Sequence, residues 1–258
     1  MGNIKFIGTG SGKTSLKRFH SSFLISTVDY NLLVDAGDGV SKALLAQNVD
    51  YNSINGILFS HLHPDHYTGL AALIVQMKMQ NRKVKLDIYV HKNLSNTLES
   101  FLINSYLFPE GMGFEITYHQ FDDDKNFAVG KNIQIRSRQN SHLKNASNLP
   151  GYKDKSFSCS SFLFNINGNM IHYTGDIGCA DDLLLFKEFD SNYLITEVTH
   201  IQFSELLELI GKEISPGKII LTHLSDGDNM LFEEKIKTLS MELSEKFIIA
   251  FDGMTFDI

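Results

Sequence analysis

Three histidines and one aspartate fall within six residues, at His61, His63, Asp65 and His66, directly after an apolar run at residues 56–59. The apolar run predicts a buried strand, and four polar side chains at the end of such a strand need partners or solvent. An extended backbone points His61 and His63 to the same side, whereas Asp65 and His66 turn into the next helix and can face a second centre. Imidazole and carboxylate together suit zinc, with iron or manganese as alternatives. The sequence therefore predicts a metal site here.

Short apolar runs alternate with amphipathic segments along the whole chain, and their periodicity predicts the regular elements. Strands are expected at residues 4–7, 22–26, 32–34, 57–59, 86–90, 133–135, 162–165, 170–173, 193–195, 219–221 and 247–249. Helices are expected at residues 40–47, 69–79, 94–106, 181–187, 203–211 and 232–243. Early hairpin-like strands followed by strand–helix alternation predict mixed sheets with helices outside, an α/β or layered α+β fold. No linker or low-complexity tract divides the chain, so a single domain is expected over residues 1–258.

The sequence also contains an internal echo. Residues 21–25 lead through a second strand to Asp35, and residues 160–164 turn at Asn167-Gly168 and lead to Asp176. Each unit is a hairpin whose second strand is followed by Asp-x-Gly. Chance could produce the echo, but a duplicated half would place the two aspartates at matching strand ends around a pseudo-two-fold axis.

The His-x-His-x-Asp-His motif resembles the signature of the metallo-β-lactamase fold superfamily, and later motifs extend the resemblance over nearly the whole chain. It implies an αββα sandwich of two mixed sheets flanked by helices. It also implies two metal ions, most simply two Zn²⁺. By this resemblance one ion is held by His61, His63 and His142, the other by Asp65, His66 and His223, and Asp176 bridges them together with a hydroxide.

Each of the later candidate ligands is an isolated residue. Its position in the chain therefore supports its assignment as a ligand more than its residue type does. His142 stands in a polar segment after a strand, with His119 as its competitor, while Asp176 and His223 each follow an apolar strand. Asp35 is expected to orient a ligand histidine or a loop amide rather than bind metal. His172 is expected to be structural.

Within the superfamily, the chain resembles the RNase Z-like branch. The glycine turn at residues 8–12, the segment 173–176 and the segment 222–225 all agree with that branch. The glycine turn fits neither a P-loop nor a dinucleotide fingerprint. Residues 194–199 resemble the RNase Z motif His-Glu-Ala-Thr with Glu197 aligned, but the histidine that assists leaving-group protonation is replaced by Thr196. Glu197 or His200 is expected to supply the proton instead, and Asp65 is the third candidate catalytic residue.

The expected activity is metal-dependent hydrolysis of a small phosphodiester, a cyclic nucleotide or short nucleotide diester. From His142 to Asp176 is 34 residues (176 − 142), which leaves no room for the tRNA-clamping arm of typical RNase Z. The net charge of −7 also argues against extended nucleic acid as the partner. Tyr106, Phe108 and Phe114 are expected to be core or loop anchors, with a base or apolar pocket as the alternative.

Three other functions stay open: RNase Z-like tRNA 3′ processing, hydrolysis of esters, thioesters or lactones, and metal-dependent ligand binding without turnover. Two cysteines give no disulfide framework, and the N-terminus shows no signal core, so a cytoplasmic protein is expected. No apolar stretch approaches the roughly 20 residues that span a bilayer. The resemblance further implies that a homodimer can form.

Overall fold

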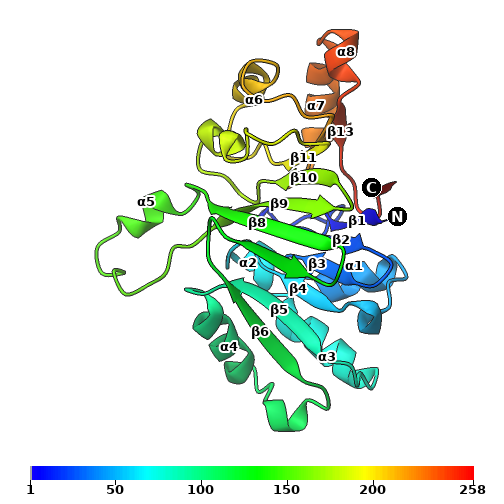
Figure 1. Cartoon of the computed structure of the whole chain (residues 1–258), viewed down its shortest axis with the longest axis vertical. Helices are drawn as coiled ribbons and strands as arrows, with labels where there is room; N and C mark the ends of the chain where they lie inside the picture. The colour runs from blue at the N-terminus through cyan, green and yellow to red at the C-terminus, as the bar shows by residue number, and fades with distance from the viewer. Residues whose placement is uncertain (1) are drawn as a thin grey trace.

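Two seven-stranded sheets pack face to face, with helices on both outer faces (Figure 1). The computed structural model describes residues 2–258. The first sheet has the order β14-β1-β2-β3-β4-β5-β6, and the second has the order β13-β12-β11-β10-β9-β8-β7. The expected αββα sandwich of two mixed sheets is confirmed.

The strands of the first sheet are β1 (Asn3–Gly8), β2 (Ser22–Ser26), β3 (Asn31–Val34), β4 (Gly56–Leu58), β5 (Leu86–His91), β6 (Ile116–Phe121) and β14 (Thr255–Asp257). Those of the second are β7 (Asn126–Val129), β8 (Ile133–Gln139), β9 (Ser160–Ile166), β10 (Asn169–Tyr173), β11 (Tyr193–Thr196), β12 (Lys218–Leu221) and β13 (Phe247–Ile249). The α-helices are α1 (Val40–Ala46), α2 (Pro64–Tyr67), α3 (Leu70–Met79), α4 (Ser95–Asn104), α5 (Lys144–Ser147), α6 (Phe203–Leu209), α7 (Asp228–Lys237) and α8 (Met241–Ser244). Short 3₁₀ turns are η1 (Tyr51–Ser53), η2 (Pro109–Gly111) and η3 (Ala180–Leu184).

The two sheets repeat one topology. In the first, the hairpin β2–β3 is antiparallel and β3, β4, β5 and β6 are then parallel. In the second, the hairpin β9–β10 is antiparallel and β10, β11, β12 and β13 are then parallel. Asp35 follows β3 and Asp176 follows β10, its counterpart. The internal echo of the sequence therefore corresponds to matching strands in two similar halves.

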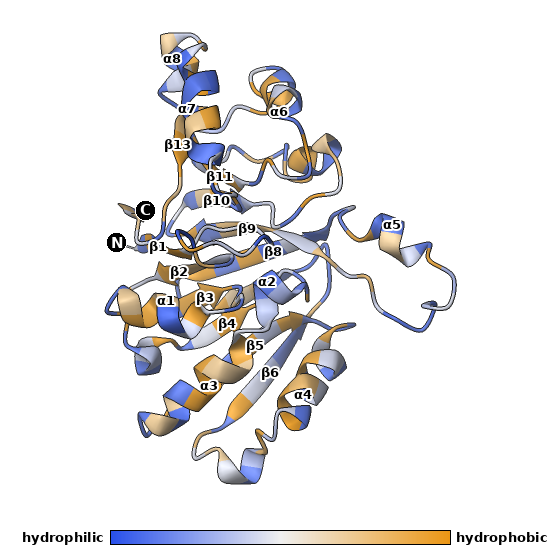
Figure 2. Ribbon diagram, turned by 180° about the vertical axis from the view of Figure 1, so that it is seen from behind, coloured by the Kyte–Doolittle hydropathy of each residue, from blue (hydrophilic) through white to orange (hydrophobic). Residues whose placement is uncertain are grey.

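Parallel strands covered on both faces explain the apolar runs of the sequence. Successive residues of β4 face opposite ways: Ile57 packs under the helices of the first sheet, and Leu58 packs between the sheets. Leu194 and Ile195 of β11 alternate in the same way in the second sheet. Figure 2 shows apolar residues concentrated in the strands of both sheets. A three-layered core results, and the ends of its strands carry the polar residues.

Several predicted elements differ from the structure. The helix expected at residues 232–243 is two helices, because Ser240 accepts a hydrogen bond from the backbone N–H of Leu243 and starts α8 anew. The helix expected at 181–187 is the 3₁₀ turn η3. Strands β6, β7 and β14 were not predicted, since they lie at or beside the sheet edges and carry many polar residues.

Among residues 2–258, no helix has the length and apolar character needed to cross a lipid bilayer.

Candidate metal centre

The first four candidate ligands are positioned by the end of β4 and the start of α2. The chain bends at Ser60 and is extended at His63, the N-cap of α2, and Pro64 occupies the first turn, where its fixed φ suits a helix start. The backbone N–H of His66 donates to the carbonyl of His63 at 2.9 Å. This tight strand-to-helix turn brings Asp65 and His66 to the end of the strand that carries His61.

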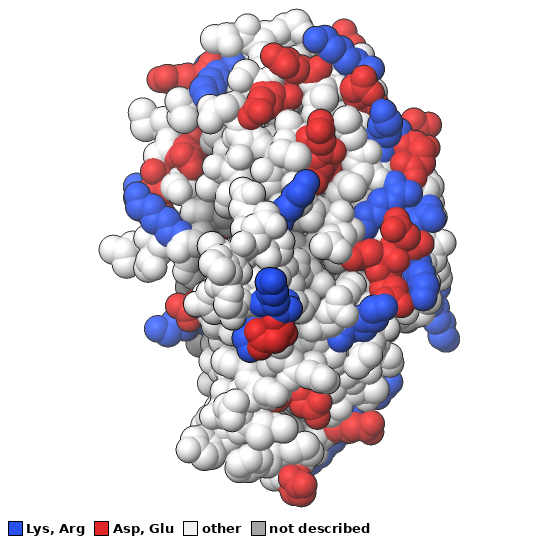
Figure 3. Space-filling view, turned by 90° about the vertical axis from the view of Figure 1, so that its left-hand side faces the viewer, with Lys and Arg blue, Asp and Glu red and all other residues white. Residues whose placement is uncertain are grey.

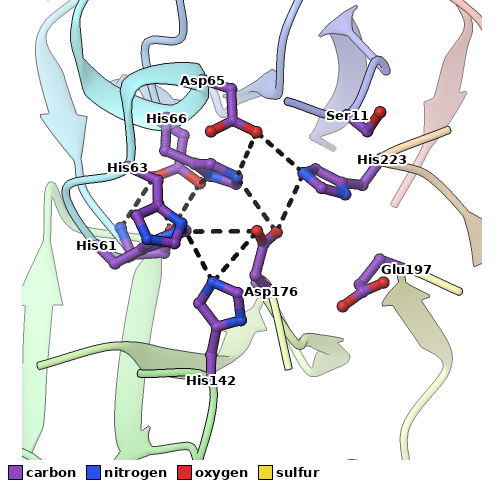
Figure 4. A network of polar contacts seen from close by, with 12 residues as sticks. Ser11, His61, His63, Asp65, His66, His142, Asp176, Glu197 and His223 are labelled. Atoms are coloured by element: carbon purple, nitrogen blue, oxygen red, sulfur yellow. Dashed lines mark hydrogen bonds and ion pairs between the residues drawn. The ribbon is translucent and has the colours of Figure 1, made fainter. Parts of the chain in front are cut away.

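The structure brings together all seven residues expected to bind metal, in two overlapping groups (Figure 4). Within each group the ligand atoms lie within 4.8 Å of one another. The first group is His61, His63, His142 and Asp176, and the second is Asp65, His66, Asp176 and His223. His142 comes from the loop after β8, Asp176 from the loop after β10 and His223 from the loop after β12. Residues 162 positions apart in the sequence (223 − 61) thus meet at one point.

Asp176 belongs to both groups, and its two oxygens divide between them. Oδ2 lies 3.8 Å from Nε2 of His61 and 3.7 Å from Nε2 of His142. Oδ1 lies 3.2 Å from Nε2 of His66 and 3.4 Å from Nε2 of His223. One carboxylate oxygen therefore faces each group, which is the arrangement required of a bridging ligand.

A second observation also indicates that these residues can hold metal ions. Nε2 of His61, Nε2 of His66 and Oδ1 of Asp176 are buried and have no hydrogen-bond partner among the described residues. A buried polar atom without a partner costs about 1–3 kcal/mol, more when the group is charged. All three atoms point into the two groups, so bound cations would satisfy them together.

The electrostatics of the cluster also favour cations. Burial lowers the pKa of His61 well below its usual value, and the nearby His66 lowers it further, so this ring is neutral and able to coordinate. Burial would raise the pKa of Asp176, but His223 and His66 outweigh it and hold that pKa well below its usual value. His61 and Asp176 therefore present a neutral imidazole and a charged carboxylate, the forms in which these groups bind metal. Burial would lower the pKa of His66, but Asp176 and Asp35 outweigh it and hold that pKa well above its usual value, so a metal ion would displace a proton from this ring.

Asp35 holds the second group in place, as the sequence predicts. It accepts hydrogen bonds from the backbone N–H of Ser60 at 2.8 Å and from the hydroxyl of Tyr173 at 2.9 Å. Its Oδ2 also lies 2.9 Å from Nδ1 of His66. That contact leaves Nε2 of His66 facing Asp176, so Asp35 fixes the orientation of the ring.

His142, and not its competitor His119, reaches the cluster. Nε2 of His142 lies 3.2 Å from Nδ1 of His63, whereas Nε2 of His119 lies 2.9 Å from a carboxylate oxygen of Asp87. The loop that carries His142 is fixed by Asp182 of η3, which accepts from the backbone N–H of Ser141 at 3.1 Å. Sequence reasoning missed Asp182 and Tyr173 as supporting residues, because neither belongs to a recognisable ligand pattern.

Glu197 and His200 form a pair beside the cluster. Glu197 is only 1% exposed, and its Oε1 lies 2.7 Å from Nδ1 of His200. The hydrogen bond to Glu197 raises the pKa of His200 above its usual value. The ring of His200 stands against that of His142, with centroids 4.7 Å apart. The side chain of His200 is partly exposed, so it can meet a molecule entering from solvent.

The three aromatic residues Tyr106, Phe108 and Phe114 lie away from the metal centre, and Phe114 is among the residues that line a separate cavity of about 630 Å³ beside α4 and β6. Phe114 precedes β6, and the start of β6 pairs with the start of β5. The cluster follows the opposite, carboxyl ends of these parallel strands. Phe114 belongs to the core, whereas Tyr106 and Phe108 lie exposed after α4.

Charges of both signs cover the side of the molecule from which α5 projects (Figure 3). In that view lysines and arginines are interleaved with acidic residues along one edge, and the centre carries few charges. The long basic stripe typical of a nucleic-acid footprint is not seen on this face.

The fold is similar to those of solved structures, and part of the sequence is similar to those of known proteins. YhfI from Bacillus subtilis, a metallo-β-lactamase fold protein, superposes with a TM-score of 0.76 at 21% identity, covering 99% of this chain and 98% of that one. The short form of human tRNase Z superposes with a TM-score of 0.72 at 18% identity, covering 99% of both chains. Ribonuclease Z of Methanococcus aeolicus is 33% identical over 126 residues, which are 49% of this chain and 38% of that relative.

These similarities define a protein of the metallo-β-lactamase fold, in its RNase Z-like branch, as the motifs indicate. The chain spans less than half the length of that curated relative. A model of the family of the anti-Pycsar protein Apyc1 matches residues 2–246. The chain belongs to this family.

Proposed function

We propose that this protein is a dinuclear-zinc phosphodiesterase that cleaves a small phosphodiester, such as a cyclic nucleotide or a short nucleotide diester. The observation that carries the proposal is the orientation of the Asp176 carboxylate, which directs one oxygen toward each group of ligands. Two zinc ions held in this way would supply an attacking hydroxide at neutral pH and would stabilise charge on phosphoryl oxygens. Manganese and iron are the alternative metals.

Membership of the RNase Z-like branch supports the choice of a phosphodiester. A ribonuclease, as the name of the Methanococcus relative says, cuts RNA, whose backbone is a phosphodiester. The type of bond that is cleaved does not determine the size of the substrate. Here the segment between His142 and Ser158 is short, and the face that carries it has interleaved charges. Both features favour a small substrate over a tRNA.

In this proposal His61, His63 and His142 hold one zinc ion, and Asp65, His66 and His223 hold the other. Asp65 has a further role as acceptor for the proton of the attacking water. Oδ2 of Asp65 lies 3.1 Å from Nε2 of His223, and its side chain keeps slight contact with solvent. Burial would raise the pKa of Asp65, but His223 and His66 outweigh it and hold that pKa well below its usual value, so the carboxylate is charged, able to bind metal, and able to accept a proton only transiently.

The Glu197–His200 pair is proposed to protonate the leaving group. Glu197 is fixed on three sides, because it also accepts from the backbone N–H groups of Ile177 at 3.1 Å and His200 at 2.9 Å. It thereby orients a ring that borders His142. In RNase Z relatives the motif begins with a histidine, which is the buried Thr196 here; His200 offers the same imidazole from four residues later.

The test combines metal analysis with a substrate panel of 2′,3′- and 3′,5′-cyclic nucleotides, dinucleotides, a tRNA precursor, and ester and lactone substrates. We expect about two zinc ions per chain and turnover of the small phosphodiesters. Asp176→Asn should reduce that turnover by at least about 100-fold, since even residues that only orient a ligand contribute about 10- to 100-fold. Asp181→Asn, which changes an exposed carboxylate of η3, is the matched control.

Each alternative function predicts a different result in this panel. Cleavage of the tRNA precursor alone would indicate tRNA processing, and turnover of esters or lactones alone would indicate a carbonyl hydrolase. Two bound metals without turnover of any substrate would indicate a binding protein.

The proposed proton donor is tested by comparing two substrates whose leaving groups differ in their need for a proton. His200→Ala should slow cleavage of a nucleotide diester, whose alkoxide leaves with difficulty, by about 10²- to 10⁴-fold. It should hardly affect p-nitrophenyl esters of phosphate, whose leaving group needs no proton. Equal losses on both substrates would remove His200 from this role and leave Glu197 as the candidate.

A further inference from the structure

β6 is the last strand of the first sheet, and within residues 2–258 it pairs with β5 alone (Figure 1). The carbonyl of Glu115, the residue before β6, accepts a hydrogen bond from the backbone N–H of Leu86 in β5 at 2.8 Å. Successive residues of a strand direct their backbone groups to opposite sides. Ile116, Tyr118 and Gln120 therefore direct their N–H and C=O groups away from β5, toward the open edge of the sheet.

This edge has little protection against pairing with another chain. Proteins usually protect an edge strand with lysines, prolines, bulges or a covering element. Residues 116–121 contain no lysine, acidic residue or proline, and their pairing with β5 shows no bulge. β6 therefore offers a regular edge to which a further strand can be added.

A cavity of about 630 Å³ lies beside this edge, between α4, η2 and β6. Its apolar lining includes Ile103 of α4, Leu107, and Ile116 and Tyr118 of β6. Ile103 is 43% exposed and the other three are partly exposed, so a bound chain can touch them. Because Ile116 and Tyr118 also direct their backbone groups to the open edge, the cavity and the edge form one groove, the β6 groove.

The acidic or basic side chains that line the β6 groove are all acidic: Glu99, Glu110 and Glu115. The ion pairs that lysines and arginines form within residues 2–258 leave these three carboxylates out. The groove therefore favours a partner with positive charge. A second copy of this chain, pairing edge to edge, would bring these glutamates against their own counterparts, which is unfavourable.

We propose that an extended peptide segment of another protein, with apolar residues at alternate positions and lysine or arginine beside them, docks in the β6 groove as an added strand. Main-chain hydrogen bonds supply affinity in this mode of binding, and side-chain pockets supply selectivity. The outward-facing residues from Ile116 to Gln120 span about 13 Å, so about five residues of the peptide are bound. The groove starts at the amino end of β6, away from the metal centre, so the proposal is independent of the proposed function.

The test titrates a fluorescent peptide of alternating lysine and valine, seven residues long, into the metal-loaded full chain. The same peptide with glutamate in place of lysine is its control. We expect saturable binding of the lysine peptide alone, weakened by added salt. Hydrogen exchange followed by NMR should slow at the amides of Ile116, Tyr118 and Gln120, whereas the amide of Thr117, which faces β5, should be unaffected.

Ile103→Lys places a positive charge in the groove at an exposed position of α4. It should weaken binding by at least about tenfold, or about 1.4 kcal/mol. Leu45→Lys is the matched control, since Leu45 is 65% exposed on α1 and does not line the groove.

Charge is tested by replacing both Glu99 and Glu110 with glutamine, which should weaken binding and reduce its dependence on salt. The same change at Glu233 and Glu234, which are exposed on α7, is the control and should have no effect.

The proposal is overturned if the lysine peptide does not bind saturably, or if the glutamate peptide binds as tightly. Equal binding by Ile103→Lys and Leu45→Lys overturns it as well. Binding without slower exchange at the outward-facing amides, together with full competition by spermidine, would indicate a site for small cations instead. A dimer in sedimentation that Ile103→Lys disrupts would assign the groove to a second copy of the chain.

Discussion

The carboxylate of Asp35 lies 2.9 Å from Nδ1 of His66, and this contact turns the other nitrogen of the ring toward Asp176. Asp35 is fully buried and has a φ of +58°, a left-handed conformation that, apart from glycine, is adopted mainly by asparagine, aspartate and histidine. Hydrogen bonds from Ser60 and Tyr173 to the same carboxylate hold its side chain in place. One residue thus couples the end of β3 to the turn that carries the ligands.

Asp35→Asn should weaken metal binding by about 10- to 100-fold, which is the usual effect of removing a partner that orients a ligand histidine. The amide keeps the size of the side chain but can no longer accept from His66, Ser60 and Tyr173 together. Zinc affinity is measured by competition with a chromophoric chelator, with Asp181→Asn as the control. Unchanged affinity would show that His66 needs no support from Asp35.

Gly12→Ala should lower activity by disturbing Asp65. A Cβ at position 12 would lie 3.1 Å from Oδ2 of Asp65, closer than side chains normally pack. The carboxylate must move by a few tenths of an ångström, which would disturb its contact with His223. The measurement compares kcat/KM and metal content with those of Gly111→Ala, where an added Cβ meets nothing within 4 Å. Equal activity in the two variants would contradict the close approach.

Metal removal should destabilise the fold. Ions that bind the folded chain alone stabilise it by about 2.7 kcal/mol at a free concentration 100 times the dissociation constant. Thermal unfolding is followed with and without a chelator, and His223→Ala serves as the comparison because it removes one ligand of the second group. The chelator should lower the Tm of the wild type more than that of the variant. Equal shifts would mean that the second group binds no ion.

Asp87 should make stability depend on pH. Burial would raise the pKa of Asp87, but contacts with His119, Lys85 and Tyr30 outweigh it, and the pKa is lowered in the folded chain. A lowered pKa contributes stability that is complete above the unfolded value, near 4, and is lost as the pH falls through the folded value.

Urea unfolding at a series of pH values checks this linkage. Asp87→Asn should reduce the free energy of unfolding at pH 7, and the difference from the wild type should shrink as the solution is acidified. Asp181→Asn, which changes an exposed carboxylate of η3, is the control for the loss of a carboxylate. A difference that stays constant from neutral to acidic pH would show that the charge of Asp87 does not contribute.

The core of the candidate site could be read from the sequence because its chemistry is local. His61, His63, Asp65 and His66 share one strand end, so their spacing alone fixes their relative directions. Asp35 and Asp176 could be placed because each ends the second strand of a similar hairpin. The αββα layering followed from the order of apolar runs and from the resemblance these motifs carry.

The parts that escaped prediction depend on contacts between distant segments. Asp182 supports the loop of His142 only because η3 folds back against it, and nothing near position 182 signals this. The β6 groove depends on α4 lying beside an edge strand that the sequence did not predict. The break between α7 and α8 depends on a single capping hydroxyl, which periodicity does not detect.

The division of ligands between the two similar halves has a consequence for biosynthesis. The amino-terminal half contributes His61, His63, Asp65 and His66. The carboxy-terminal half, which is synthesised later, contributes His142, Asp176 and His223. Neither half contributes all the candidate ligands, so a truncated chain that lacks the second half cannot form the proposed metal centre. The proposed metal centre can therefore form only after His223, the last of these ligands in the sequence, has been synthesised and the two sheets have packed together.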